Sequence, residues 1–154
     1  MDRLNDLLAK AKPTFWKKGR LETFENWPFQ SGDNECNPER MAAAGFYCVG
    51  SKEEPDLVEC FICSKQLDGW DPDDDPWSEH EKHQPSCAFV NLNKQEEASW
   101  TLDDLYHLLL ETAKKSLERD ANQSINKVKE HMKISVTQIP GICKAVRRSQ
   151  KNPS

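Results

Sequence analysis

The sequence predicts an α+β fold: a short three-stranded sheet with short helices, followed by one long C-terminal α-helix. Three observations predict it. Strand-like runs separated by turn residues lie in the middle of the chain, helix-start signals flank them, and apolar residues at helical spacing mark the last third. Only 36% of the 154 residues are hydrophobic, less than one compact core of that length usually contains. We therefore expect a small folded domain and an extended helix.

An N-terminal segment, residues 1–17, precedes the predicted domain. A helix is expected over residues 2–12, because apolar side chains recur there at helical spacing and Pro13 ends the pattern. The residues on its apolar side are Leu4, Leu7, Leu8 and Ala11.

Residues 18–90 are predicted to form the small α+β domain. One helix begins at Asn37-Pro38-Glu39, where a capping side chain precedes proline in the first turn, and Gly45 can adopt the left-handed conformation that ends it. A second helix opens at Asp75-Pro76-Trp77 and stops before Pro85. The strand-like runs between the two helices are Phe46–Val49, Leu57–Phe61 and Gln66–Asp68.

After a polar linker at residues 91–101, a long amphipathic helix is predicted over residues 102–139. Thr101 and Asp104 match a capping box, and Pro140 ends the pattern. At 1.5 Å per residue the helix would be ~57 Å long, so most of its apolar stripe must meet a partner helix or remain solvated. Residues 140–154 are expected to be a disordered basic tail. The residues of the stripe are Leu102, Leu105, Leu109, Ala113, Leu117, Ala121, Ile125, Val128, Met132 and Val136.

Charge is unevenly distributed along the chain, whose net charge is −5. Between Glu53 and His83, eleven acidic residues and two lysines give a formal −9, whereas the last fifteen residues hold four basic residues and no acid. An acidic middle favours a cationic ligand, and no direct binding of nucleic acid is expected. No apolar run approaches the ~20 residues of a membrane span, and no secretory signal is evident, so we expect a soluble intracellular protein.

Four residues have the spacing of a tetrahedral zinc site, C-x2-C-x16-H-x6-C. Two thiolates three residues apart on a turn can face one ion, and a helical histidine with a cysteine just beyond the helix completes the set. Because the protein fills all four positions, no position remains for a reactive water, and the ion would be structural. The four ligands are Cys60, Cys63, His80 and Cys87.

An enzyme is disfavoured by the remaining cysteines, Cys36, Cys48 and Cys143. A ubiquitin ligase would need a second zinc cluster, for which three cysteines are too few, and no unligated cysteine is spaced beside a histidine as a nucleophile would be. These three are expected to be small buried hydrophobes or idle thiols.

Residues 18–90 resemble the baculoviral IAP repeat (BIR) family, and one such repeat followed by a long helix resembles the survivin-type members of that family. The resemblance implies one structural zinc ion and no catalysis. The motifs that carry it are Arg20-Leu21-Glu22-Thr23-Phe24, Trp27-Pro28, Ala44-Gly45-Phe46-Tyr47, Asp56 to Cys63, Gly69-Trp70, Asp74-Asp75-Pro76-Trp77 and His80 to Cys87.

The resemblance further implies a subunit of the chromosomal passenger complex. Its long helix would bundle with borealin-like and inner centromere protein-like helices, and its BIR domain would read a histone tail phosphorylated on threonine, so that Aurora kinase is brought indirectly to centromeres. The resemblance also implies a homodimer as an open alternative, and a location in nucleus and cytoplasm, at centromere, spindle midzone and midbody during mitosis.

Six groove residues carry over from the resemblance. Lys65 and His83 would face the phosphate, Asp68, Asp74 and Trp70 would hold the N-terminal alanine, and Glu54 the arginine that follows it. The residue types agree, since an α-ammonium needs carboxylates and a tryptophan ring can interact with a cation. Position 68 departs from the family, which usually has glutamate there.

Plainer roles compete with some of these assignments. Asp75 is better explained as a helix cap, Trp27 and Trp77 as packing residues, and His83 could be an ordinary surface histidine. The competing function is a direct inhibitor of apoptosis that binds caspases or their antagonist peptides in the same groove. A preference for an unphosphorylated alanine-first peptide would favour it.

Overall fold

The computed structural model describes residues 2–151, and side chains over residues 4–144; residues 1 and 152–154 lie outside the described chain. The chain divides into two compact units, Met1–Lys115 and Ser116–Ser154. The elements in order are α1 (Asp2–Lys10), η1 (Pro13–Phe15), α2 (Lys17–Leu21), η2 (Glu22–Phe24), α3 (Pro38–Ala43), β1 (Phe46–Cys48), β2 (Val58–Cys60), β3 (Gln66–Leu67), α4 (Pro76–His83), α5 (Ala88–Leu92), η3 (Glu97–Ser99) and α6 (Leu102–Lys151).

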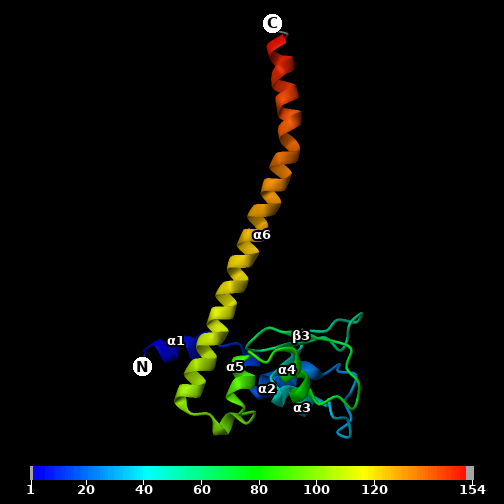
Figure 1. Ribbon diagram of the computed structural model, residues 1–154, viewed down its shortest axis with the longest axis vertical. Coiled ribbons are helices and arrows are strands. Elements are labelled where there is room, and N and C mark those ends of the chain that lie inside the picture. The colour runs from blue at the N-terminus through cyan, green and yellow to red at the C-terminus, as the bar shows by residue number, and fades with distance from the viewer. Residues whose placement is uncertain (1, 152–154) are drawn as a thin grey trace. The chain divides into compact units, whose positions relative to one another are not determined.

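The sheet of the first unit is antiparallel with strand order β1-β2-β3. Phe46 faces Cys60 across β1 and β2, and Val58 faces Leu67 across β2 and β3. Short helices surround this small sheet (Figure 1). The α+β fold with three strands, short helices and a long C-terminal helix is therefore confirmed.

Both predicted helix starts are confirmed by their caps. The Asn37 side chain accepts a hydrogen bond from the backbone N–H of Arg40 at 3.0 Å, and the Asp75 side chain accepts one from that of Ser78 at 3.0 Å. Each supplies an acceptor to an N–H that has no partner within the helix. Gly45 has φ +91°, the left-handed conformation expected after α3.

Aromatic rings form much of the core of the first unit. Phe61 lies edge-on to Phe15 and to Phe89, with ring centroids 5.5 and 5.0 Å apart. Trp27 is 2% exposed, as expected for a packing residue, and Trp77 packs half-buried against the same core. Such edge-to-face pairs add specific geometry to the burial of large apolar surfaces.

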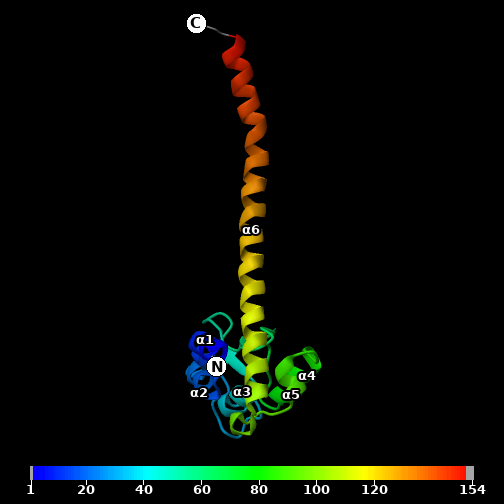
Figure 2. The same cartoon turned by 90° about the vertical axis from the view of Figure 1, so that its left-hand side faces the viewer.

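The predicted N-terminal helix is present as α1. Its leucines are partly buried and pack against the core, although the helix itself is short. Figure 2 shows α1 and α2 on one side of the first turns of α6, with α4 and α5 on the other. Residues 1–17 are thus part of the first unit.

The first turns of α6 also belong to the first unit. The predicted capping box is present, because Thr101 N–H donates to Asp104 Oδ2 at 2.8 Å and Asp104 N–H donates to Thr101 Oγ1 at 3.2 Å. Leu108 and Leu109 are 1% and 3% exposed. The first unit therefore extends to Lys115, and not only to residue 90, since these leucines fill its core.

The predicted partner-facing stripe needs a correction at its N-terminal end. Leu109 is buried in the chain's own core, and Leu105 packs against it, so neither faces a partner. The stripe is exposed from Leu117 onward, and Leu102 is also exposed. Spacing alone could not separate the two parts, because the same apolar stripe packs on the core at its N-terminal end and is exposed farther along the helix.

The predicted end of the long helix at Pro140 is wrong. Pro140 lies inside α6, which continues to Lys151, so residues 140–151 are helical instead of disordered. Proline removes one i to i−4 hydrogen bond, and its neighbours here are exposed, so the carbonyl that loses its partner can be hydrated. The remainder of the predicted tail, residues 152–154, lies outside the described residues. No helix in the described chain is long and apolar enough to cross a membrane.

Candidate zinc site and peptide-binding cleft

The four predicted zinc ligands come from four neighbouring pieces of the first unit. Cys60 ends β2, Cys63 lies in the turn before β3, His80 lies in α4, and Cys87 precedes α5 as its cap residue. The turn is closed by a hydrogen bond from Ser64 N–H to the Cys60 carbonyl at 3.0 Å. This turn directs both of its thiols to the same point.

The geometry of the donor atoms fits a tetrahedral zinc ion. All four ligand atoms lie within 4.8 Å of one another. Cys60 Sγ is 4.0 Å from Cys87 Sγ, and Cys63 Sγ is 3.6 Å from His80 Nε2. A tetrahedron with Zn–S bonds of ~2.3 Å and Zn–N bonds of ~2.0 Å has S···S edges of ~3.8 Å and S···N edges of ~3.5 Å. The residues therefore form the zinc site expected from the spacing.

Hydrogen bonding fixes the histidine ligand. His80 is fully buried, and its Nδ1 lies 2.9 Å from the Ala44 carbonyl. A carbonyl only accepts, so Nδ1 carries a proton, and Nε2 is the nitrogen left to bind an ion among the cysteines. The ring orientation is thus set before any ion binds.

The electrostatics of the cluster favour a cation. Burial, together with the neighbouring thiols Cys63 and Cys87, raises the pKa of Cys60 well above its ordinary value. Burial alone would lower the pKa of His80, but hydrogen bonds to Cys63 and Cys87 raise it to about 9. Buried thiolates are unfavourable unless a positive charge lies close to them. A divalent cation would stabilise all three thiolates at once.

A small cleft opens beside Trp70, between the turn after β3, the loop at residues 71–75 and α4. Its volume is about 140 Å³. At ~30 Å³ per water molecule it would hold four or five waters, so it suits one small group of a ligand. The lining residues are Leu67, Asp68, Gly69, Trp70, Asp74, Glu79 and His83.

Four of the six predicted groove residues therefore meet in this cleft: Asp68, Trp70, Asp74 and His83. Lys65 and Glu54 do not line it. Lys65 is half-buried just before β3, and Glu54 is exposed on the loop between β1 and β2. Their roles in binding remain predictions.

Backbone hydrogen bonds hold the cleft in shape. Asp56 Oδ2 accepts hydrogen bonds from the N–H groups of Gly69 and Trp70, at 2.8 and 3.1 Å. Gly69 has φ +72°, which a glycine adopts without strain. Asp74 Oδ2 accepts from Asp71 N–H at 2.8 Å, which orients the Asp74 carboxylate on the loop.

Trp70 is 6% exposed and packs edge-on against Phe46 and Trp27, with ring centroids 5.7 and 6.5 Å apart. Among the described residues, its Nε1 is a buried side-chain donor without a hydrogen-bond partner. A buried donor without a partner destabilises the folded state by ~1–3 kcal/mol. The packing of the ring against Phe46 and Trp27 offsets this cost.

Glu79 and Leu67 are cleft residues that sequence reasoning missed. Glu79 Oε2 lies 3.2 Å from His83 Nε2, one helical turn away on α4. The spacing of four residues on a predicted helix could have identified Glu79, because side chains at i and i+4 are neighbours. The cleft thus contains three carboxylates, and the histidine lies against one of them.

Comparison with known proteins agrees with this architecture. The Inhibitor of Apoptosis domain (BIR) model matches residues 20–91. The chain is 45% identical over 126 residues to Baculoviral IAP repeat-containing protein 5 of Mus musculus, covering 79% of this chain and 86% of that protein. It is 43% identical over 123 residues to the protein of that name in Cavia porcellus, covering 80% and 85%. It is 50% identical over 106 residues to Baculoviral IAP repeat-containing protein 5.2 of Xenopus tropicalis, covering 69% and 67%.

The matched segment contains the whole zinc site and the whole cleft, and the similarity to the relatives covers more of the chain than this segment. Identity at this level over most of both chains places the protein in the inhibitor-of-apoptosis family, among the survivin-type proteins that carry a single BIR domain.

Proposed function

We propose that this protein is a non-enzymatic adaptor of cell division, a subunit of a chromosomal passenger complex. Its cleft would read the N-terminus of a histone tail that begins Ala-Arg-phosphothreonine. Its long helix would bundle with borealin-like and inner centromere protein-like helices and so bring an Aurora kinase to the histone. The expected locations are nucleus and cytoplasm, and centromere, spindle midzone and midbody in mitosis.

The observation that carries the proposal is the cluster of carboxylates around Trp70. Asp68, Asp74 and Glu79 line one small cleft, and a free α-ammonium is the group that such a cleft suits best. A charge-assisted hydrogen bond to it would contribute ~1.5–3 kcal/mol. The volume of about 140 Å³ suits an alanine methyl group better than a large side chain.

The third residue of the peptide would carry the phosphate. His83 is exposed at the cleft, and its Nε2 can donate to a phosphate oxygen when the ring is protonated. Glu79 would then share His83 with the ligand, since it lies 3.2 Å from the same nitrogen. Lys65 is the predicted second donor.

Binding calorimetry with the full chain tests this proposal. The ligands are peptides that begin Ala-Arg-Thr, with and without phosphate on the threonine, and a phosphopeptide whose N-terminus is acetylated. We expect the phosphate to tighten binding at least tenfold and acetylation to weaken it at least a hundredfold, because the carboxylates lose their cation.

Variants assign these effects to the cleft. Asp74→Asn should weaken binding of every peptide about tenfold or more, and His83→Ala should remove most of the preference for phosphate. Asp73→Asn is the matched control, because Asp73 is exposed on the same loop but does not line the cleft. Equal binding of acetylated and free peptides would contradict the proposal.

The family name supports a second candidate function, inhibition of apoptosis. The same carboxylates would accept any peptide with a free alanine at its N-terminus, including an antagonist of caspase inhibitors. Equal or tighter binding of the unphosphorylated peptide would favour this function over the chromatin reader.

A further inference from the structure

We propose that the peptide bond between Asp120 and Ala121 in α6 is a cleavage site for a caspase, an aspartate-specific cysteine protease. The inference goes beyond the proposed adaptor function and requires no partner helix. Cleavage there would separate the zinc-binding unit from most of the exposed stripe of α6.

The sequence around this bond matches what caspases recognise. These proteases bind the carboxylate of the aspartate before the cut through arginine side chains, favour glutamate two residues earlier, and favour a small residue after the cut. Asp120 is the aspartate, Glu118 the glutamate and Ala121 the small residue. Leu117, the first of the four residues before the cut, is of the type that initiator caspases favour there.

The pattern Glu-x-Asp occurs at one other place in the sequence, residues 54–56, and the structure argues against cleavage there. Asp56 is half-buried in the loop between β1 and β2, and its Oδ2 accepts hydrogen bonds from two backbone N–H groups at 2.8 and 3.1 Å. The residue after it, Leu57, is large. The carboxylate that a caspase must bind is therefore engaged at Asp56, and the following residue does not suit the protease.

The bond after Asp120 lies outside the buried core. The first unit ends at Lys115, and every residue from Ser116 to Lys144 is exposed. Leu117 itself is 70% exposed. The side chains that the protease must bind are therefore accessible in the chain by itself.

Helix α6 must open locally before the bond can be cut, because proteases bind their substrates in an extended conformation. Opening at this place breaks helical hydrogen bonds but exposes no buried side chain. Asp120, Asn122 and Ser124 are weak helix formers, and a helix without tertiary packing is only marginally stable in water. Cleavage of the opened form is then governed by how often this stretch opens.

The carbonyl of the bond to be cut has a side-chain partner in the helix. Ser124 Oγ donates to the Asp120 carbonyl at 2.9 Å. A serine that donates to the carbonyl four residues earlier slightly destabilises a helix. Replacing Ser124 by alanine should therefore make the helix open less often.

The reaction is a hydrolysis, and its co-reactant is water. The thiolate of the protease attacks the carbonyl carbon of Asp120, the C–N bond to Ala121 breaks, and the nitrogen leaves with a proton. Water then hydrolyses the thioester and frees the thiolate. The products are residues 1–120, which end in a new carboxylate, and residues 121–154, which begin with a new ammonium group.

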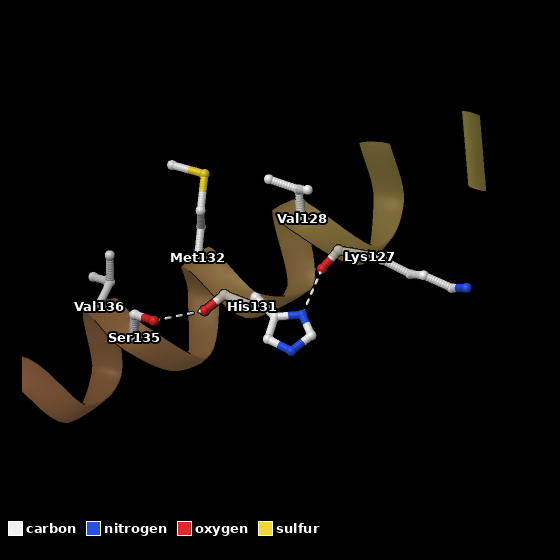
Figure 3. Close-up of a pocket in the computed structure, with 6 residues that line it drawn as sticks. All are labelled: Lys127, Val128, His131, Met132, Ser135 and Val136. Atoms are coloured by element: carbon white, nitrogen blue, oxygen red, sulfur yellow. Dashed lines mark hydrogen bonds between the residues drawn. The ribbon is translucent and has the colours of Figure 1, made fainter. Parts of the chain in front are cut away.

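The two products carry different surfaces. The first keeps the zinc ligands and the cleft, whereas the second keeps the apolar row Val128, Met132 and Val136, which lies along one side of α6 in Figure 3. Under the proposed adaptor function, cleavage would detach the peptide reader from its partner helices. Bound partner helices would also cover Ala121, which belongs to the same stripe, and so protect the bond.

The full zinc-loaded chain and a purified initiator caspase that cleaves Leu-Glu-His-Asp substrates test the inference, with products identified by mass spectrometry. We expect one cut, between Asp120 and Ala121. Asp120→Asn keeps the size and the weak helix propensity of the side chain, and it should slow cleavage roughly a hundredfold or more. Asp103→Asn is the matched control, because Asp103 is an exposed aspartate of the same helix, and this variant should be cut at the wild-type rate.

A double variant and a peptide test the local opening. Asn122→Ala with Ser124→Ala strengthens the helix beyond the four residues before the cut, and it should slow cleavage of the chain about threefold or more. A synthetic peptide of residues 114–125 is too short for a stable helix, so it should be cut faster than the chain and at one rate with or without these substitutions.

Four results would overturn the inference: a cut at another bond, an uncut peptide, a peptide that is cut while the chain is not, or wild-type cleavage of Asp120→Asn. Equal rates for the double variant and wild type would refute the local opening. Peptide calorimetry tests the cleft separately, so the cleavage site and the proposed function can fail independently.

Discussion

The guanidinium of Arg20, which is fully buried, lies 3.5 Å from the carboxylate of Glu97. Arg20 also donates to the carbonyls of Ala42 and Phe15, at 2.9 and 2.6 Å, and lies 4.3 Å from the centre of the Phe61 ring. One charged side chain thus joins α2, α3 and the segment before α6. Burial is the main reason that its pKa is lowered to about 10, and Glu97 opposes this decrease.

We expect Arg20→Met to lower the free energy of unfolding by ~3–5 kcal/mol, because it leaves the carbonyls of Thr14, Phe15 and Ala42 without this donor and removes the charge partner of the half-buried Glu97. Urea denaturation followed by tryptophan fluorescence measures this. Lys17→Ala is the control: Lys17 Nζ pairs with Glu96 at the surface, and such a pair contributes ~0–1 kcal/mol. Similar losses in both variants would contradict the role given to Arg20.

Removal of zinc should unfold the first unit. The four ligands hold β2, α4 and the start of α5 together, and the domain is small enough to depend on such a link. We expect a strong chelator, or Cys63→Ser, to abolish the near-ultraviolet circular dichroism of the buried tryptophans. Cys48→Ser is the matched control, because Cys48 is half-buried outside the cluster. Retention of the signal after verified loss of the metal would contradict a structural role for zinc.

The residues whose roles could be predicted are those marked by a signal in the neighbouring sequence. The zinc ligands have a diagnostic spacing, and the caps Asn37 and Asp75 precede proline in the first turn. Helix α5 was missed because no side chain caps it; it begins at a zinc ligand, Cys87. The start of α5 is thus fixed by a metal ligand and by packing on the core, and no local sequence signal marks it.

Other features depend on contacts distant in sequence and could not be predicted. Arginine is usually exposed, so nothing near Arg20 indicates that Glu97, 77 residues later, is its partner. Asp56 accepts from Gly69 and Trp70 only because the loop before β2 folds onto the turn after β3. The burial of Leu109 likewise depends on where the core lies.

The capping box of α6 should make stability sensitive to acid. Lys94, whose Nζ lies 2.6 Å from Asp104 Oδ2, is the first cause that lowers the pKa of Asp104, from 3.8 to about 2, and the hydrogen bonds of Thr101 follow. A carboxyl with a lowered pKa stabilises the folded state above its unfolded pKa, and this contribution is lost as the pH falls from 3.8 to about 2.

We therefore expect wild type to lose more stability than Asp104→Asn over that interval, and the two to converge below about pH 2. Urea midpoints at a series of pH values measure the difference. Both proteins keep the same zinc ligands, so acid effects on the metal affect both alike. Asp103→Asn, one residue away and exposed, should follow wild type; a parallel pH dependence of all three proteins would contradict the prediction.

Two leucines of α6, nine residues apart, should separate the core from the partner surface. Leu108 is 1% exposed and Leu117 is 70% exposed. Leu108→Ala should cost ~2–5 kcal/mol of unfolding free energy, because it removes buried apolar surface and leaves a cavity. Leu117→Ala should change the stability of the chain alone by less than ~0.5 kcal/mol, since it removes only exposed surface. Urea denaturation measures the stability of both variants. A large loss of stability in Leu117→Ala would show that this part of the stripe packs on the chain itself, and the exposed part of the stripe would then begin farther along α6.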